Sequence, residues 1–210
     1  MPFSAASVDP RPARRQAKFD NILSVAWSIA AEQGLAALSL HEVARRVGLR
    51  QPSLYAYIES KSALYDAMFS QAAKSLLDHV KSWSYSADPR QAVRDSCLAL
   101  FDFVVEHPVE GLLIFERTIP GFEPSAAAYG YAQDYVKFTI NLLAKAGVKD
   151  QGHVDLFIAM VGGLINQQQT NEPGGDRWTR HLEAVLEMLF AYVDGRIQGP
   201  KDAPAAKGSS

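Results

Sequence analysis

Apolar residues recur at helical spacing along most of the chain. From residue 18 they stand three or four positions apart, the period of an amphipathic α-helix, at Ile22, Val25, Ala26, Ile29 and Ala30. Similar stripes follow residue 39 and residue 60, and the second of these is long, with Leu64, Met68, Ala72, Leu76 and Val80. Alternating patterns typical of strands are scarce. The sequence therefore predicts an all-α protein.

Turn and cap residues fix where the first helices begin and end. Ser39 and Glu42 have the S-x-x-E spacing of a capping box, so a helix should begin there. Gly48 suits the left-handed position that closes a helix, and Pro52 suits the first turn of the next one. Ser60 can cap the long helix that follows. Up to residue 80 the sequence predicts a long helix, two short helices and a second long helix.

The rest of the chain also reads as helical, interrupted by segments rich in proline and glycine. Further helices are expected near residues 90–106, 108–117, 125–146, 151–170 and 176–195, which makes about nine in all. We expect residues 1–17 to form a flexible basic arm and residues 18–64 a three-helix head. Residues 65–196 should form a helical bundle, and residues 197–210 a disordered tail of low complexity.

The stretch LSLHEVARRVGLRQPSLYAYIESKSALYDAM, residues 38–68, has the helix-turn-helix pattern of two short helices joined at a glycine. In such a motif the second helix presents its first side chains to base edges in the major groove of DNA. Leu54 and Ile58 should pack inward. The pattern alone leaves two interpretations open, a DNA reader and a helical hairpin that binds a protein partner.

The same stretch resembles the DNA-binding head of the TetR family of bacterial transcriptional regulators. Gly48 matches the turn glycine of that family, Leu54 and Tyr55 its Leu-Tyr pair, and Ser60 and Lys61 its Ser-Lys pair. The resemblance covers about residues 18–68. It departs from the common pattern at residues 57 and 58, where Tyr and Ile replace His and an aromatic residue, and at residue 50, where Arg stands in place of Ser or Thr.

The resemblance implies a division of roles in the head. The expected contacts to base edges come from Arg50, Gln51, Ser53 and Tyr55, since Arg can pair with guanine and Gln with adenine. The expected contacts to phosphates, which position the protein without reading sequence, come from Ser39, Tyr57 and Lys61. Tyr55 could instead pack within the head. Three arginines, Arg11, Arg14 and Arg15, could either follow the minor groove or form a solvated tail.

The resemblance also implies that the bundle binds a small molecule and forms a homodimer on a palindromic operator of double-stranded DNA. The segment from residue 97 to 135 mixes aromatic and polar residues, as ligand pockets do. The pocket candidates are Phe101, His107, Phe115, Glu116, Tyr129, Asn166 and Gln167. The dimer-interface candidates, on two apolar stripes near the C-terminus, are Phe157, Val161, Leu164, Leu182, Leu186 and Leu189. Those stripes could also be the core of one protomer.

Composition narrows the class of protein further. The chain has 210 residues and a single cysteine, so no intrachain disulfide can form, and its apolar runs are shorter than the ~18 residues needed to span a bilayer. The net charge is +3 over residues 1–64, from eight Lys and Arg against five Asp and Glu, although the whole chain carries −2. A basic head suits contact with a polyanion.

No catalytic motif stands out. The five histidines lack H-x-x-x-H spacing, no Walker lysine or G-x-S-x-G elbow occurs, and nothing indicates a metal or a cofactor. We therefore expect a cytoplasmic, ligand-responsive DNA-binding regulator rather than an enzyme, a repressor that a small-molecule inducer releases from its operator. The alternative is a helical interaction module that uses the head for a protein partner.

Overall fold

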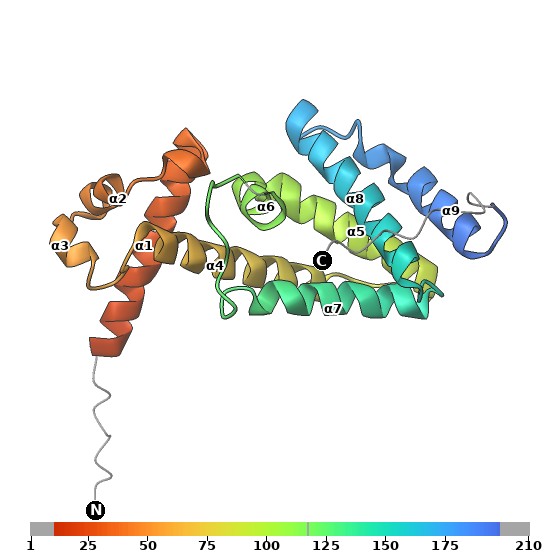
Figure 1. The fold of residues 1–210 in the computed structure, drawn as a ribbon, viewed down its shortest axis with the longest axis horizontal. Helices are drawn as coiled ribbons and strands as arrows, with labels where there is room; N and C mark the ends of the chain where they lie inside the picture. Colours follow the sequence, from red (N-terminus) through yellow and green to blue (C-terminus); the bar gives the residue numbers. More distant parts are fainter. Residues whose placement is uncertain (1–10, 117, 198–210) are drawn as a thin grey trace, which may run out of the picture. The chain divides into compact units, whose positions relative to one another are not determined.

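The computed structural model describes residues 11–116 and 118–197, and every regular element in that part of the chain is helical, which confirms the all-α prediction (Figure 1). The α-helices are α1 (Arg11–Gln33), α2 (Leu40–Val47), α3 (Gln51–Leu54), α4 (Lys61–Ser82), α5 (Pro89–Glu106), α6 (Pro108–Phe115), α7 (Gly130–Lys145), α8 (Gln151–Asn171) and α9 (Leu182–Val193). Two 3-10 turns, η1 (Leu35–Ala37) and η2 (Thr179–His181), complete the set.

The chain forms two compact units, and their composition differs from the division expected at residue 65. The first unit contains the chain up to Ser75 together with Val109–Gln133, and the second contains Leu76–Pro108 and the chain from Asp134 onward. The first unit thus includes part of α4 and α6 as well as the head. The reason is that Tyr65 and Phe69 of α4 share a buried core with Leu113 of α6.

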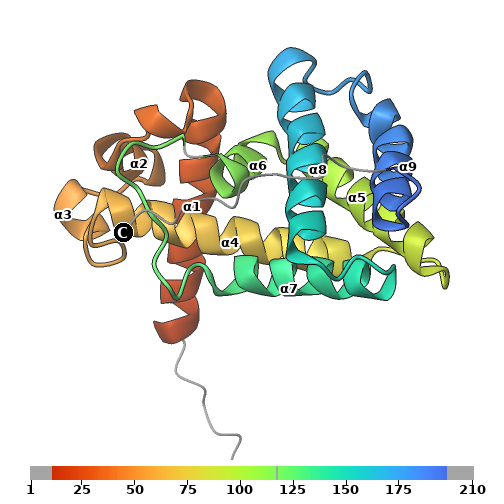
Figure 2. The ribbon, with the colours of Figure 1, turned by 45° about the vertical axis from the view of Figure 1, so that its right-hand side comes forward.

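The core of the head confirms the predicted apolar stripes. Ile22 and Ile29 of α1, Val43 of α2 and Leu54 of α3 are all 0% exposed. Figure 2 shows α2 and α3 beside α1, with the start of α4 next to them. Ile58 is also buried, so the turn that follows α3 has a buried side chain before it and another after it. The three-helix head is therefore held by side chains at the positions that the periodicity predicted.

The structure confirms most of the predicted helix ends and corrects one. Gly48 ends α2 in the left-handed conformation, with φ 73° and ψ 31°, and the hydroxyl of Ser60 accepts a hydrogen bond from the Ala63 N–H at 3.0 Å. The capping box is wrong. Ser39 is the N-cap residue of α2, but its side chain makes no capping hydrogen bond, and the Glu42 carboxylate is bound by two arginines.

The arm expected over residues 1–17 is wrong for the part that the structure describes. Helix α1 begins at Arg11, and residues 1–10 lie outside the described residues, as do residues 198–210 of the expected tail. Two contacts hold the first turns of α1 in place. Arg15 donates a hydrogen bond to the carbonyl of Ala56 at 3.0 Å, and Lys18 donates one to the carbonyl of Val47 at 3.2 Å.

The second unit packs α5, α8 and α9 against each other around an apolar core. Phe103 of α5 is 1% exposed and Leu189 of α9 is 2% exposed. Asp88 and Asp150 cap α5 and α8, since each carboxylate accepts a hydrogen bond from a backbone N–H three residues later. The capping carboxylates fix where these two long helices begin.

Candidate nucleic-acid interface and ligand cleft

The four side chains expected to read base edges lie on the surface of the head. Arg50, Gln51, Ser53 and Tyr55 are exposed on and next to α3, whereas Leu54 between them is 0% exposed. Tyr55 is 46% exposed, which excludes the alternative that it packs inside the head. A buried leucine thus anchors a short helix whose remaining side chains face solvent.

The three expected phosphate contacts have different surroundings. Ser39 is exposed at the start of α2. Lys61 is exposed, donates a hydrogen bond to the carbonyl of Ala36 at 3.2 Å and lies 5.5 Å from the centre of the Tyr65 ring. Tyr57 is half-buried. All three hydroxyl or ammonium groups belong to the first unit, as do the base-edge candidates.

Lys18 is a functional candidate that the sequence did not single out, and Arg15, expected to follow the minor groove or lie in a solvated tail, is instead held in the head. The guanidinium carbon of Arg15 lies 5.8 Å from the centre of the Tyr57 ring, and Arg15 also bonds to Ala56. It therefore joins the first turns of α1 to the segment after α3. A signal was available, because Arg11, Arg14, Arg15 and Lys18 stand at i, i+3, i+4 and i+7, which is one face of a helix.

An ion-pair network joins α1 to α2. The Arg46 guanidinium donates two hydrogen bonds of 2.7 Å to the Glu32 carboxylate and one of 2.7 Å to Glu42, which also binds Arg45 at 2.7 Å. Hydrogen bonds from Arg45 and then Arg46 lower the pKa of Glu42 from 4.5 to about 2, and the hydrogen bond from Arg46 lowers the pKa of Glu32. These arginines are occupied by carboxylates within the head.

This network predicts a pH dependence of stability. Both carboxyl pKa values are lower in the folded state, so the network stabilises the head fully above the ordinary carboxyl pKa of 4.5 and loses that contribution as pH falls towards about 2. Urea unfolding followed by circular dichroism between pH 7 and pH 2.5 should show this loss. In Glu42→Gln the loss should be smaller, and an identical pH profile would contradict the role of Glu42. The effect should weaken in high salt, since these groups are exposed.

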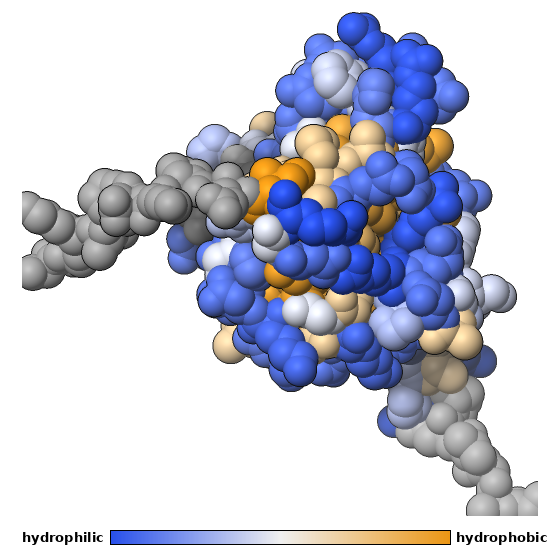
Figure 3. Space-filling model, turned by 90° about the vertical axis from the view of Figure 1, so that its right-hand side faces the viewer, coloured by the Kyte–Doolittle hydropathy of each residue, from blue (hydrophilic) through white to orange (hydrophobic). Residues whose placement is uncertain are grey.

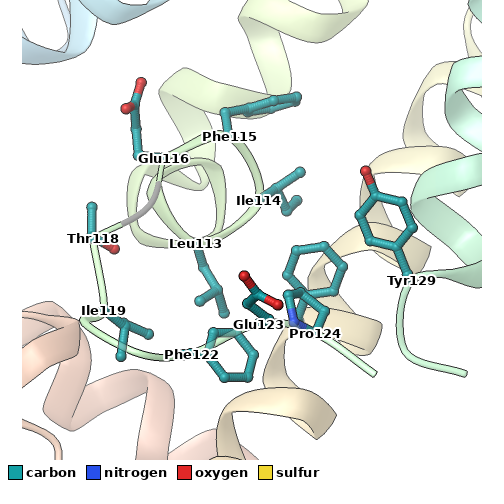
Figure 4. A pocket seen from close by; sticks show the side chains of 11 residues that line it. Leu113, Ile114, Phe115, Glu116, Thr118, Ile119, Phe122, Glu123, Pro124 and Tyr129 are labelled. Atoms are coloured by element: carbon teal, nitrogen blue, oxygen red, sulfur yellow. The ribbon is translucent and has the colours of Figure 1, made fainter. Parts of the chain in front are cut away.

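Three of the seven pocket candidates meet in one cleft of the first unit. Phe115, Glu116 and Tyr129 line a cleft of about 430 Å³, a volume within the range of small-molecule sites (Figure 4). Its other lining residues, which the sequence did not single out, are Phe69, Leu113, Ile114, Thr118, Ile119, Phe122, Glu123 and Pro124. Arg117, which stands in the same stretch of sequence, lies outside the described residues.

The other four pocket candidates belong to the second unit and do not line that cleft. Phe101 is buried in α5, and the ring of His107 packs against Phe103 with 4.9 Å between ring centres. Asn166 and Gln167 lie on α8, where Gln167 accepts a hydrogen bond from Asn171 at 2.6 Å. The buried glutamine of this helix is the next residue, Gln168, which accepts hydrogen bonds from the backbone of residue 178 and the hydroxyl of residue 179.

A smaller apolar groove of about 100 Å³ lies among α5, α7 and α8 of the second unit. Phe157 and Val161 line it together with Tyr135 and Thr139, its main polar side chains. Burial raises the pKa of Tyr135, so its phenol is neutral at physiological pH. This groove could hold only a small or slender apolar group, since its volume is well below that of a typical ligand site.

The dimer-interface candidates are mostly core residues of one protomer. Five of the six are between 2% and 6% exposed: Phe157, Val161, Leu182, Leu186 and Leu189. Leu164 is half-buried. Side chains already buried in the second unit leave little area for a partner. The large apolar side chains that remain exposed on α8 and α9 are Leu156, Ile158 and Met188, at 41%, 54% and 51%.

Sites of two other kinds are absent from the described part of the chain. No helix there is both long and apolar enough to cross a bilayer. No group of three or more His, Cys, Asp or Glu side chains is arranged there to hold a metal ion.

Comparison with known proteins agrees with this geometry. Residues 22–68 match the family described as "Bacterial regulatory proteins, tetR family". The HTH-type transcriptional activator FasR of Mycolicibacterium smegmatis is 34% identical over 121 residues, which are 57% of this chain and 52% of FasR. The chain spans about half the length, or less, of the curated relatives it matches.

Solved structures share the fold beyond the head. The protein SCO4313 aligns with a TM-score of 0.72 at 21% identity, over 87% of this chain and 100% of its own. BioQ in complex with its double-stranded DNA operator aligns with a TM-score of 0.58 at 19% identity, over 82% of this chain and 98% of its own. The match therefore identifies residues 22–68 as a head of the TetR family of bacterial regulatory proteins, and solved structures share the all-helical fold over more than four fifths of the chain.

Proposed function

We propose that the protein is a DNA-binding transcriptional regulator, a repressor that a small-molecule inducer releases from its operator. The observation that carries this proposal is the exposure of Arg50, Gln51, Ser53 and Tyr55 around a helix anchored by Leu54. These side chains suit base edges in the major groove. Ser39, Tyr57 and Lys61 would bind phosphates and set the position of the helix.

The operator would be palindromic and the regulator a homodimer, because one short reading helix covers few base pairs and a two-fold axis doubles the contact. A surface on α8 supports this. Leu156 and Gly163 are seven residues apart, hence on one face of the helix, and both are exposed. Figure 3 looks at the side where α9 lies in Figure 1 and shows apolar patches among hydrophilic residues. Met188 of α9 is exposed as well.

Release would follow from binding of the inducer in the bundle or in the 430 Å³ cleft. Phe69 of α4 and Leu113 of α6 line that cleft, and α4 begins at Lys61, one of the proposed phosphate contacts. A ligand that binds the DNA-free arrangement of α4 more tightly would draw the population away from the operator-bound state. Equal affinity of the ligand for both states would contradict this mechanism.

The test is binding of the purified protein to DNA upstream of its own gene across a salt series. Affinity should fall steeply with salt, because phosphate neutralisation releases counterions. Lys61→Ala should weaken binding to all sequences and reduce the salt slope by about one, whereas Arg50→Ala should cost about 1–3 kcal/mol and relax specificity at one position. Fluorescence anisotropy on operator and scrambled DNA measures both effects.

A protein partner for the head remains the alternative, and the same experiment separates it. An interaction module predicts little binding to any DNA even at low salt, where nonspecific contacts to phosphates are strongest. Strong low-salt binding without preference for the upstream DNA would instead indicate an operator elsewhere in the genome. Absence of low-salt binding would contradict the regulator.

A further inference from the structure

We propose that the 430 Å³ cleft of the first unit binds a lipophilic organic cation whose charge is held by Glu123. The binding step stands by itself, and only its regulatory consequence rests on the proposed function. Three features of the cleft lead to this ligand class: exposed aromatic rings, an exposed carboxylate on the lining without a partner among the described residues, and a wall fixed to α4.

The first feature is the aromatic surface. Phe115 and Tyr129 line the cleft and are 39% and 44% exposed, so a ligand in the cleft could cover both rings. The Tyr129 ring stacks on Phe69 at 5.9 Å between centres, with 15° between the planes. The faces of such rings attract cations through their quadrupole, and most strongly where water is partly excluded.

The second feature is charge. In Figure 4 the Glu123 side chain lies among Leu113, Phe122 and Pro124, whereas the Glu116 carboxylate points away from them. Among the described residues that line the cleft there is no lysine, arginine or histidine. No ion pair or hydrogen bond to the Glu123 side chain occurs among the described residues. An unpaired carboxylate favours a cationic ligand and disfavours an anionic one, such as a fatty acid.

The third feature is the fixed wall. The Asp66 carboxylate of α4 accepts hydrogen bonds from the backbone N–H of Ser125 at 2.7 Å and from its hydroxyl at 2.6 Å. The Phe122 ring packs on Tyr65, with 5.4 Å between centres. These contacts hold the residues on both sides of Glu123 against α4. Because the segment that carries Glu123 is held before binding, its backbone needs little ordering when a ligand enters.

The test uses two probes of the same shape and opposite charge, tetraphenylphosphonium and tetraphenylborate. Isothermal titration calorimetry with the full chain, without DNA, should show binding of the phosphonium and none of the borate. Glu123→Gln should weaken phosphonium binding about fivefold, and Glu116→Gln, the matched control on the same cleft, less than about twofold. Tyr129→Leu should weaken it about twofold to fivefold through the lost ring face.

Several results would overturn the proposal. These are absence of phosphonium binding, equal binding of the borate, or an affinity that Glu123→Gln leaves unchanged. A second measurement avoids reliance on the variants, since added sodium chloride should weaken phosphonium binding to the unmodified protein. Operator binding is measured separately. Loss of the phosphonium result with intact DNA binding contradicts this inference alone, and the reverse contradicts the proposed function alone.

Discussion

Leu54→Ala should lower the free energy of unfolding of the first unit by about 2–5 kcal/mol, the usual cost of removing a fully buried leucine. Leu54 is 0% exposed and shares the core of the head with Val43 and Leu64. The shortened side chain leaves a cavity where α3 is anchored. Urea unfolding should be followed by Trp27 fluorescence in a background with Trp83→Phe and Trp178→Phe, because Trp27 is the described tryptophan of the first unit.

The neighbouring residue supplies the matched control. Tyr55 is 46% exposed, so Tyr55→Ala should change the unfolding free energy by less than about 0.5 kcal/mol while it impairs operator recognition. Leu54→Met, which conserves volume, should cost less than about 1.5 kcal/mol. Equal unfolding free energies for Leu54→Ala and Tyr55→Ala would contradict the division between an anchoring and a reading residue. That result would also remove the main support for the proposed DNA-binding surface.

Periodicity predicted the anchors of the head because burial there follows local helix geometry. Pro52 marks the first turn of the short helix. Counted from there, the apolar Leu54 and Ile58 stand where the helix and the turn after it face inward. Gly48 was equally predictable, since its positive φ of 73° suits glycine far better than residues with a side chain. Features that depend on a few neighbouring residues were therefore predicted from the sequence.

Features that depend on distant residues were not predictable in the same way. Arg45 and Arg46 reach Glu42 within α2, but Arg46 reaches Glu32 only after α1 and α2 pack. The wall of the cleft depends on Asp66 and Ser125, which are 59 residues apart in sequence. The first turns of α1 looked like an arm because the apolar stripe begins later, at Ile22. Their anchor is polar, which hydrophobic spacing does not detect.

The dimer-interface candidates show a third limit, since an apolar stripe does not say what covers it. Phe157 and Val161 satisfy the same spacing as a dimer face but are buried within the second unit. Leu156 is exposed on another face of α8, and Gly163 shares that face. Periodicity finds an apolar face, and only packing shows whether the protomer or a partner buries it.

Gly163→Leu should convert the proposed homodimer to a monomer and weaken operator binding by about 10²–10⁴-fold, the advantage that two linked sites have over one. A Cβ atom at Gly163 would meet no atom within 4 Å in the protomer, so the variant should fold. Across a two-fold axis, however, the larger side chain would separate the two copies of α8. Size-exclusion chromatography with light scattering measures the mass, and anisotropy measures operator affinity.

Two controls restrict the interpretation of that result to one face of α8. Gly163→Ala adds a single methyl group, should keep the dimer and should stabilise the helix by up to about 1 kcal/mol. Gly162→Leu alters the adjacent position, where a Cβ atom also meets nothing within 4 Å, but it lies about 100° further round the helix, beside the apolar groove. It should leave the dimer intact. Both faces of α8 are apolar, and only one of them can lie on the two-fold axis. A dimer that survives Gly163→Leu and dissociates in Gly162→Leu would therefore place the interface on the face of Ile158. That result would contradict the surface proposed here.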